Sequence, residues 1–156
     1  MPAAAQLSLP EAVKAAQLYK FASFVGWPDD AFPSPTTPLQ VCVVGNPTVT
    51  AAVARAAEGQ TVNGRSFAVR DVPASETDTC HIAYLSGMSG ADRAEVVTRL
   101  SGRPVLTVTD DAHGSSRGVV NFRVLDNRVR FEIDNAAAAH NGLTVSSRLL
   151  ALAVPR

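Results

Sequence analysis

Two cysteines and a neighbouring histidine are the residues of this chain whose chemistry is easiest to recognise. Cys42 lies within the apolar run LQVCVVG (39–45), while Cys80 and His81 open the apolar run CHIAYLS (80–86). If the two runs form neighbouring parallel strands, their backbones lie about 4.8 Å apart. A disulfide is then within reach when the register matches. Two free cysteines that pack as small hydrophobic side chains fit equally well, so the residues alone leave both states open.

Other reactions of the cysteines fit the sequence less well. A zinc site usually contains a Cys-x-x-Cys pair or histidines at ligand spacing, and this chain has neither pattern. A catalytic thiol needs an exposed and electropositive setting, unlike the middle of VCVVG. The chain also lacks the HExxH, GxSxG, P-loop and GxGxxG motifs. We therefore expect no metal, no cofactor and no catalytic residue.

The polar segment TDDAHG offers an alternative site for a ligand. Asp110 and His113 follow a predicted strand, and open α/β sheets bind ligands where their strands end. Ser146, at the start of a predicted helix, could add a hydroxyl group. These three residues would suit a small-molecule-binding protein or a hydrolase. The simpler interpretation, which we prefer, is that the carboxylates solvate a turn and that Ser146 caps its helix.

Strands alternate with helices along the chain. A first helix is predicted over 8–26, with Ser8 as its cap and Gly26 and Pro28 at its end. Buried strands are predicted at 39–45, 80–86 and 104–110, an alternating strand at 65–72, and further helices at 49–59, 91–100, 135–142 and 146–154. This order predicts an α/β fold in which helices flank a mainly parallel central sheet, with an antiparallel hairpin at its edge. We expect one domain over 1–156, with an ordered core over 8–154.

The predicted hairpin, 119–133, carries three arginines. A two-residue turn at Asp126-Asn127 places Arg123 opposite Arg130 and leaves one face apolar. The other face should be solvated; it holds Asn121, Arg123, Arg128, Arg130 and Glu132. Like charges that face each other destabilise a sheet, so an acidic partner would relieve them. The candidate partner-binding residues are these arginines together with two aromatic residues near the end of the first helix: Arg123, Arg128, Arg130, Phe24 and Trp27.

Composition narrows the class of protein. The 156 residues include 14 basic and 14 acidic side chains, so the net charge is zero. This balance argues against nucleic-acid binding and against a membrane-surface protein, since both need a basic excess. No run of 18 apolar residues is present, so no bilayer span or direct membrane insertion is expected. The opening MPAAAQ is similar to what remains after signal-peptide cleavage at an A-x-A site, which would fit export.

Several stretches, taken in order, resemble the YfiR/HmsC-like family of periplasmic proteins. They are VKAAQLYKFASFVGWP, LQVCVVGNP, CHIAYLS, PVLTVTD and VRFEIDNAAAAHNGLTVSSRLLALA, and together they extend over about residues 12–153. The most specific parts are the helix that leads to Trp-Pro and the closing F-E-I-[DN]…G-L-x-V-S-S-x-L-L motif. The family's motif positions correspond here to Lys14, Tyr19, Trp27, Pro28, Cys42, Gly45, Cys80, Asp110, Phe131, Ser146 and Ser147.

The resemblance implies an exported α/β protein that is not an enzyme. Family members hold an inner-membrane diguanylate cyclase inactive by binding its periplasmic sensor domain, and release raises cyclic di-GMP and promotes biofilm formation. Some members form dimers. An oxidising compartment would favour a Cys42–Cys80 disulfide. Some members also carry a second cysteine pair before the hairpin, where this chain reads DDAHGSSRGVV, so control through a second bond is not expected here.

Overall fold

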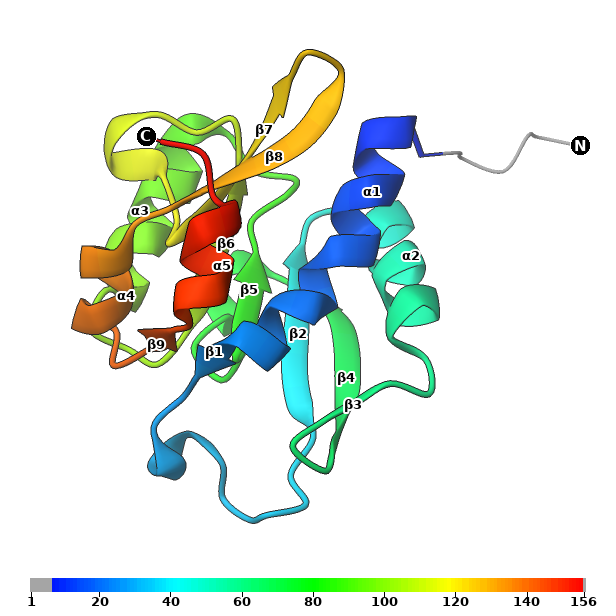
Figure 1. Ribbon diagram of the computed structural model, residues 1–156, viewed down its shortest axis with the longest axis vertical. Coiled ribbons are helices and arrows are strands. Elements are labelled where there is room, and N and C mark those ends of the chain that lie inside the picture. Colours follow the sequence, from blue (N-terminus) through cyan, green and yellow to red (C-terminus); the bar gives the residue numbers. More distant parts are fainter. Residues whose placement is uncertain (1–6, 156) are drawn as a thin grey trace, which may run out of the picture.

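A seven-stranded sheet forms the centre of the protein. The computed structural model describes residues 7–155, and the opening MPAAAQ lies outside them. Figure 1 shows the chain and its elements. The helices are α1 (Leu9–Leu18), α2 (Pro47–Ala57), α3 (Gly90–Leu100), α4 (Asn135–His140) and α5 (Ser147–Leu152). The strands are β1 (Val25–Gly26), β2 (Leu39–Val44), β3 (Thr61–Val62), β4 (Arg65–Val72), β5 (Ile82–Tyr84), β6 (Leu106–Asp110), β7 (Val120–Leu125), β8 (Arg128–Ile133) and β9 (Thr144–Val145).

The sheet has the order β3-β4-β2-β5-β6-β7-β8. The pairings that run from β4 to β7 are parallel, and the outermost pairing at each end is antiparallel. The predicted α/β class, with a mainly parallel sheet and an antiparallel edge hairpin, is confirmed. The prediction that β2 and β5 are parallel neighbours is also confirmed, because Cys42 pairs with Ala83.

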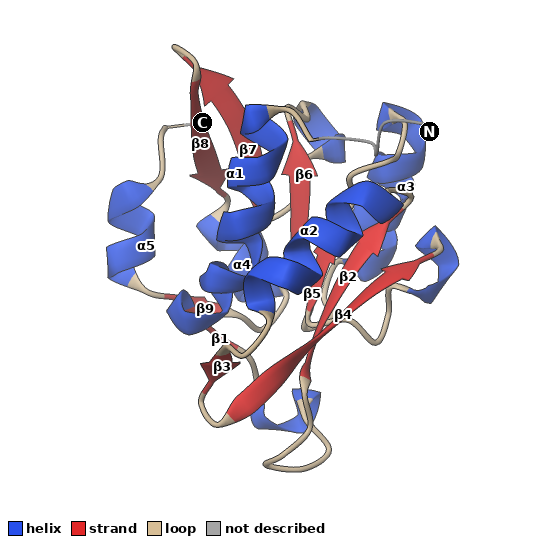
Figure 2. Cartoon of the chain, turned by 90° about the vertical axis from the view of Figure 1, so that its right-hand side faces the viewer, coloured by secondary structure: helices blue, strands red, loops and turns tan. Residues whose placement is uncertain are grey.

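Helices cover both faces of the sheet. Alternate residues of β2 divide between two clusters of buried side chains, with Leu39, Val41 and Val43 on one face and Cys42 and Val44 on the other. The first cluster joins the sheet to α1, α2, α4 and α5, and the second joins it to α3. In Figure 2, α1 and α2 lie in front of the strands and α3 lies behind them. Burial of both faces explains why the parallel strands read as nearly continuous apolar runs.

The first helix is shorter than the sequence predicted. It begins as expected, with Ser8 accepting from the Glu11 N–H and Glu11 in turn accepting from the Ser8 N–H. It then changes to a 3₁₀ segment over Tyr19–Phe24 and to β1. Val25 and Gly26 pair with β9, more than a hundred residues further along the chain. The helix predicted over 8–26 is α-helical to Leu18 and 3₁₀ over Tyr19–Phe24, and the prediction is wrong for Val25 and Gly26, where a long-range pairing decides the conformation.

The hairpin has the predicted register and a different exposure. Phe122 faces Phe131 and Arg123 faces Arg130 across a turn at Asp126 and Asn127, which are both left-handed. The prediction of a solvated second face is wrong for Asn121 and Glu132, which are buried. The segment after β6 covers this end of the hairpin, since the Asn121 side chain exchanges hydrogen bonds with the backbone of Ala112.

The loops that follow β2 and β5 cross in close contact. Gly87 donates to the Val44 carbonyl, and a Cβ on Gly87 would lie 2.2 Å from the carbonyl oxygen of Gly45. Gly45 itself is left-handed, with φ +71°. Both positions therefore require glycine, which explains Gly45 among the family's motif positions.

Candidate protein-binding surface

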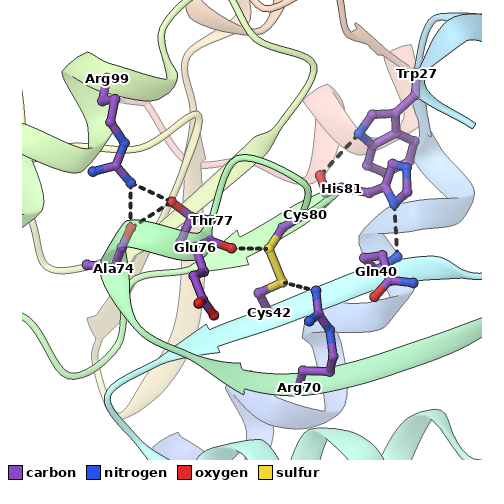
Figure 3. The surroundings of a disulfide bond; sticks show 10 residues. All are labelled: Trp27, Gln40, Cys42, Arg70, Ala74, Glu76, Thr77, Cys80, His81 and Arg99. Atoms are coloured by element: carbon purple, nitrogen blue, oxygen red, sulfur yellow. Dashed lines mark hydrogen bonds between the residues drawn. A yellow bond between two sulfur atoms is a disulfide. The ribbon is translucent and has the colours of Figure 1, made fainter.

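Cys42 and Cys80 form a disulfide (Figure 3). Their Cα atoms are 6.0 Å apart, and both side chains are buried on the face of the sheet that α3 covers. The bond links the middle of β2 to the segment just before β5. The residues alone left the free and bonded states open, and the family resemblance favoured the bonded one, which the structure has. Because each sulfur is bonded to the other, neither is available as a thiolate for catalysis or for binding a metal.

His81, next to Cys80, is a buried structural histidine. Its Nδ1 accepts from the Gln40 N–H at 2.9 Å, so the ring proton lies on Nε2, which donates to the Ala31 carbonyl at 2.8 Å. The ring also stacks on Phe32, with centroids 4.2 Å apart. Burial lowers the pKa of His81, and the nearby positive charge of Arg65 lowers it further, against the opposing hydrogen bond to Ala31. His81 is therefore held in its neutral form.

Trp27 and Phe24 are half-buried. The Trp27 indole N–H donates to the His81 carbonyl at 3.1 Å, as Figure 3 shows, and its ring lies edge-on to Phe32. Phe24 packs against the main core. Both predicted partner-binding residues thus make contacts within the fold, and Trp27 holds the segment that follows β1 against the start of β5. Their role towards a partner stays a prediction.

Lys14 and Asp110, two of the family's motif positions, form an ion pair. The Lys14 ammonium lies 3.0 Å from Asp110 Oδ1, and the Tyr84 hydroxyl donates to Asp110 Oδ2 at 2.6 Å. Burial, followed by the adjacent charge of Asp110, raises the pKa of Tyr84 well above its usual range. Asp110 therefore fastens α1 to the ends of β5 and β6. Both residues are among the family's motif positions, but nothing in the sequence predicts that they pair.

The three residues of the alternative ligand site are not brought together. Asp110 is paired with Lys14 and Tyr84, and His113 is exposed on the loop beyond it. Ser146 caps α5 through the Leu149 N–H, and its own N–H donates to the Phe24 carbonyl. In Figure 1, β9 and α5, which flank Ser146, lie away from the end of the molecule where α1 begins. No observation among residues 7–155 favours a shared site.

Arg123 is neutralised within the fold. Its Nη1 donates to Glu132 at 3.1 Å and its Nε donates to Asp111 at 3.0 Å. The other oxygen of the buried Glu132 accepts from Asn121 at 2.9 Å. These contacts reduce the charge repulsion between the facing residues Arg123 and Arg130 without an external partner. We therefore assign Arg123 to the fold, although the sequence grouped it with the partner-binding arginines.

Arg128 and Arg130 remain as the exposed cations of the hairpin. Neither forms an ion pair with any residue between 7 and 155. Both line a depression of about 500 Å³ together with Leu125, Asp126 and Val154. They are therefore the two predicted partner-binding arginines whose charge is still available.

An apolar groove lies on the other face of the same hairpin. It has a volume of about 490 Å³, and it is lined by Leu9, Pro10, Val13, Val124, Asn127, Arg128 and Val129. Leu9 is 77 % exposed, Val124 37 % and Leu125 39 %, so three large aliphatic side chains meet solvent near the hairpin tip. Figure 1 shows the tip extending from the body beside the start of α1. Exposed aliphatic groups that cluster in this way are typical of interaction sites.

We name these residues the hairpin surface: Leu9, Val13, Val124, Leu125, Arg128, Val129 and Arg130. The surface combines an apolar groove with two guanidinium groups that form no ion pair within residues 7–155, and protein interfaces commonly join apolar area to arginine. The ionisable side chains that line the groove and the depression are Arg128, Arg130 and the turn residue Asp126. The chemistry that this surface supports is the binding of a protein with apolar and acidic side chains.

Comparison with known families agrees with the resemblance found in the sequence. Residues 11–154, which make up nearly the whole chain, match the model of the YfiR/HmsC-like family. The family is regulatory and non-catalytic, and its members are periplasmic, which fits a disulfide that requires an oxidising compartment. Within residues 7–155 no helix is long and apolar enough to cross a membrane. The chain belongs to the YfiR/HmsC-like family.

Proposed function

We propose that this chain is a periplasmic regulator that represses an inner-membrane diguanylate cyclase by binding its periplasmic sensor domain. It thereby lowers cyclic di-GMP and restrains biofilm formation. The observation that carries the proposal is the hairpin surface, where Arg128 and Arg130 border exposed aliphatic side chains in a chain of this family. A regulator needs such a surface and no catalytic group.

The mechanism follows from linkage. A sensor domain that exchanges between an active and an inactive state shifts towards whichever state the regulator binds more tightly. A preference of about 100-fold moves an evenly populated sensor to about 99 % inactive. Release of the regulator restores the original balance, so the cyclase resumes synthesis. A homodimer, as in some relatives, stays a prediction, and it would let one regulator hold two sensor domains.

A measurement of cyclic di-GMP tests this function. In the host, removal of the gene should raise the cellular concentration of cyclic di-GMP. Expression of the exported chain should return that concentration to its original, lower value. The same chain retained in the cytoplasm is the matched control and should not restore it, because it cannot reach the sensor domain. Unchanged cyclic di-GMP after removal of the gene would contradict the proposal.

A further inference from the structure

The outer edge of β8 carries backbone groups that no described strand pairs. In an antiparallel hairpin, facing pairs alternate between hydrogen-bonded and non-hydrogen-bonded ones. The Phe131 carbonyl accepts from Val154, which lies outside the hairpin, so the pair Phe122 and Phe131 is of the second kind. The pair Val124 and Val129, two residues further on, is then also of the second kind. The N–H and carbonyl groups of Val129 therefore point away from β7.

The chain itself uses only part of this edge. The Val154 N–H donates to the Phe131 carbonyl at 2.9 Å. Within residues 7–155, no backbone hydrogen bond outside the hairpin involves Val129. Residues 7–155 thus make one backbone hydrogen bond to this edge, at Phe131, and none at Val129. Open strand edges are sites where an extended segment of another chain can add a strand.

The side chains around this edge define the segment that would fit. Val129 and Val124 face the apolar groove with Leu9 and Val13. Arg130 lies on the opposite face, Arg128 at the tip lines both the groove and the depression, and both arginines are exposed. A strand added to β8 would follow the same alternation, because successive side chains point to opposite faces. Its apolar side chains would enter the groove, and its acidic side chains would meet the two arginines.

We propose that the partner binds by strand addition: an extended segment with alternating apolar and acidic residues pairs with the outer edge of β8 at Val129. This inference rests on the proposed function, because it states how the sensor domain is bound. The charge complementarity to Arg128 and Arg130 selects an acidic segment over a basic one. The groove selects aliphatic side chains on its other face.

The experiment uses the ¹⁵N-labelled chain and the purified periplasmic sensor domain of the host's cyclase. The Val129 amide should exchange with deuterium rapidly in the free chain and slowly in the complex, because it gains a hydrogen bond. Val129→Pro removes this outward N–H, which an edge strand tolerates, together with the valine side chain, and should weaken binding by about tenfold or more. Val129→Ile keeps the N–H and an aliphatic, β-branched side chain in the groove, and should change affinity by less than about threefold.

A charge variant tests the other half of the inference. The double substitution R128E/R130E should weaken binding by about tenfold or more, since it places acidic groups opposite acidic groups. R55E/R148E alters two exposed arginines of α2 and α5 by the same net charge, and should bind as the unaltered chain does.

The outcomes separate the two proposals. If the unaltered chain does not bind the sensor domain, the proposed function fails. If it binds while the Val129 amide still exchanges rapidly and Val129→Pro binds normally, the function stands and strand addition is overturned. Should Val129→Pro fail to fold, the exchange of Val129 in the unaltered complex decides the question alone.

Discussion

The buried disulfide is the covalent constraint at the residue scale. It closes a loop between residues 38 positions apart, and bonds that close loops of this size stabilise a fold by about 2–4 kcal/mol. We therefore expect a reducing agent to lower the free energy of unfolding of the unaltered chain by that amount, measured by urea denaturation. The control C42A/C80A should have the same urea midpoint of unfolding with and without the reducing agent. Equal unfolding midpoints for the reduced and oxidised chains would contradict this account.

The arginines of the hairpin differ in what they do for the fold. Arg123 neutralises the buried Glu132, so Arg123→Ala leaves a buried carboxylate without its cation. We expect this change to lower the free energy of unfolding by about 1–3 kcal/mol. Arg128→Ala, on the same strand pair and exposed, should change it by less than about 0.5 kcal/mol. Thermal unfolding of both variants checks the assignment, and equal effects would show that Arg123 has no special structural role.

The residue types alone identified some of the residues that matter in the fold, but they did not predict which polar side chains are buried. The cysteines, Asp110 and Ser146 were visible as motif positions, and Ser146 caps its helix as predicted. The burial of Asn121 and Glu132 could not be predicted, because it depends on a loop that folds over the hairpin. A signal was nevertheless present: a glutamate opposite an asparagine, beside facing arginines, is a polar cluster that needs internal partners.

At the scale of elements, the segment between β1 and β2 is held by a neutral histidine. His81 accepts from Gln40 and donates to Ala31, so protonation of Nδ1 would remove the first of these bonds. The pKa of His81 is lowered in the fold from its ordinary value of 6.5. The unfolded chain therefore binds more protons than the folded chain between the two pKa values, and stability falls as the pH drops below about 6.5.

We expect the melting temperature to decrease from about pH 6.5 to pH 5 for this reason. His81→Gln should make that decrease smaller, while His113→Gln, which alters an exposed histidine, should leave it unchanged. Differential scanning calorimetry over this pH range measures both. A decrease that is identical in the His81 variant would show that other groups cause it.

Elements with local signals were predicted well, and elements made by distant contacts were not. The hairpin register followed from the turn residues Asp126 and Asn127, and α1 began at its predicted cap. The two-residue strands β1 and β9 are too short to show a hydrophobic periodicity, so neither segment gave a signal that predicted their pairing. That pairing is also what shortened the predicted first helix, and it places Trp27 against His81.

At the scale of the whole molecule, the proposed function depends on which charged side chains have no ion-pair partner among the described residues. The net charge is zero, and two of the described ion pairs, Lys14 with Asp110 and Arg123 with Glu132, include a largely buried side chain. The hairpin surface is different because its arginines form no ion pair with the residues that the structure describes, and they adjoin exposed aliphatic groups. The position of this surface at the sheet edge, beside α1, leaves it open to a second protein. The sequence could suggest the arginines, but only the fold separates Arg123 from Arg128 and Arg130.

The most direct test of the central claim is a pull-down from the host's membranes with the oxidised chain as bait, read out by mass spectrometry. The account predicts recovery of a diguanylate cyclase that has a periplasmic sensor domain. Folded R128E/R130E bait should recover much less of it, and R55E/R148E bait should recover as much as the unaltered chain. If the folded, oxidised chain recovers no membrane cyclase, it is not the repressor proposed here.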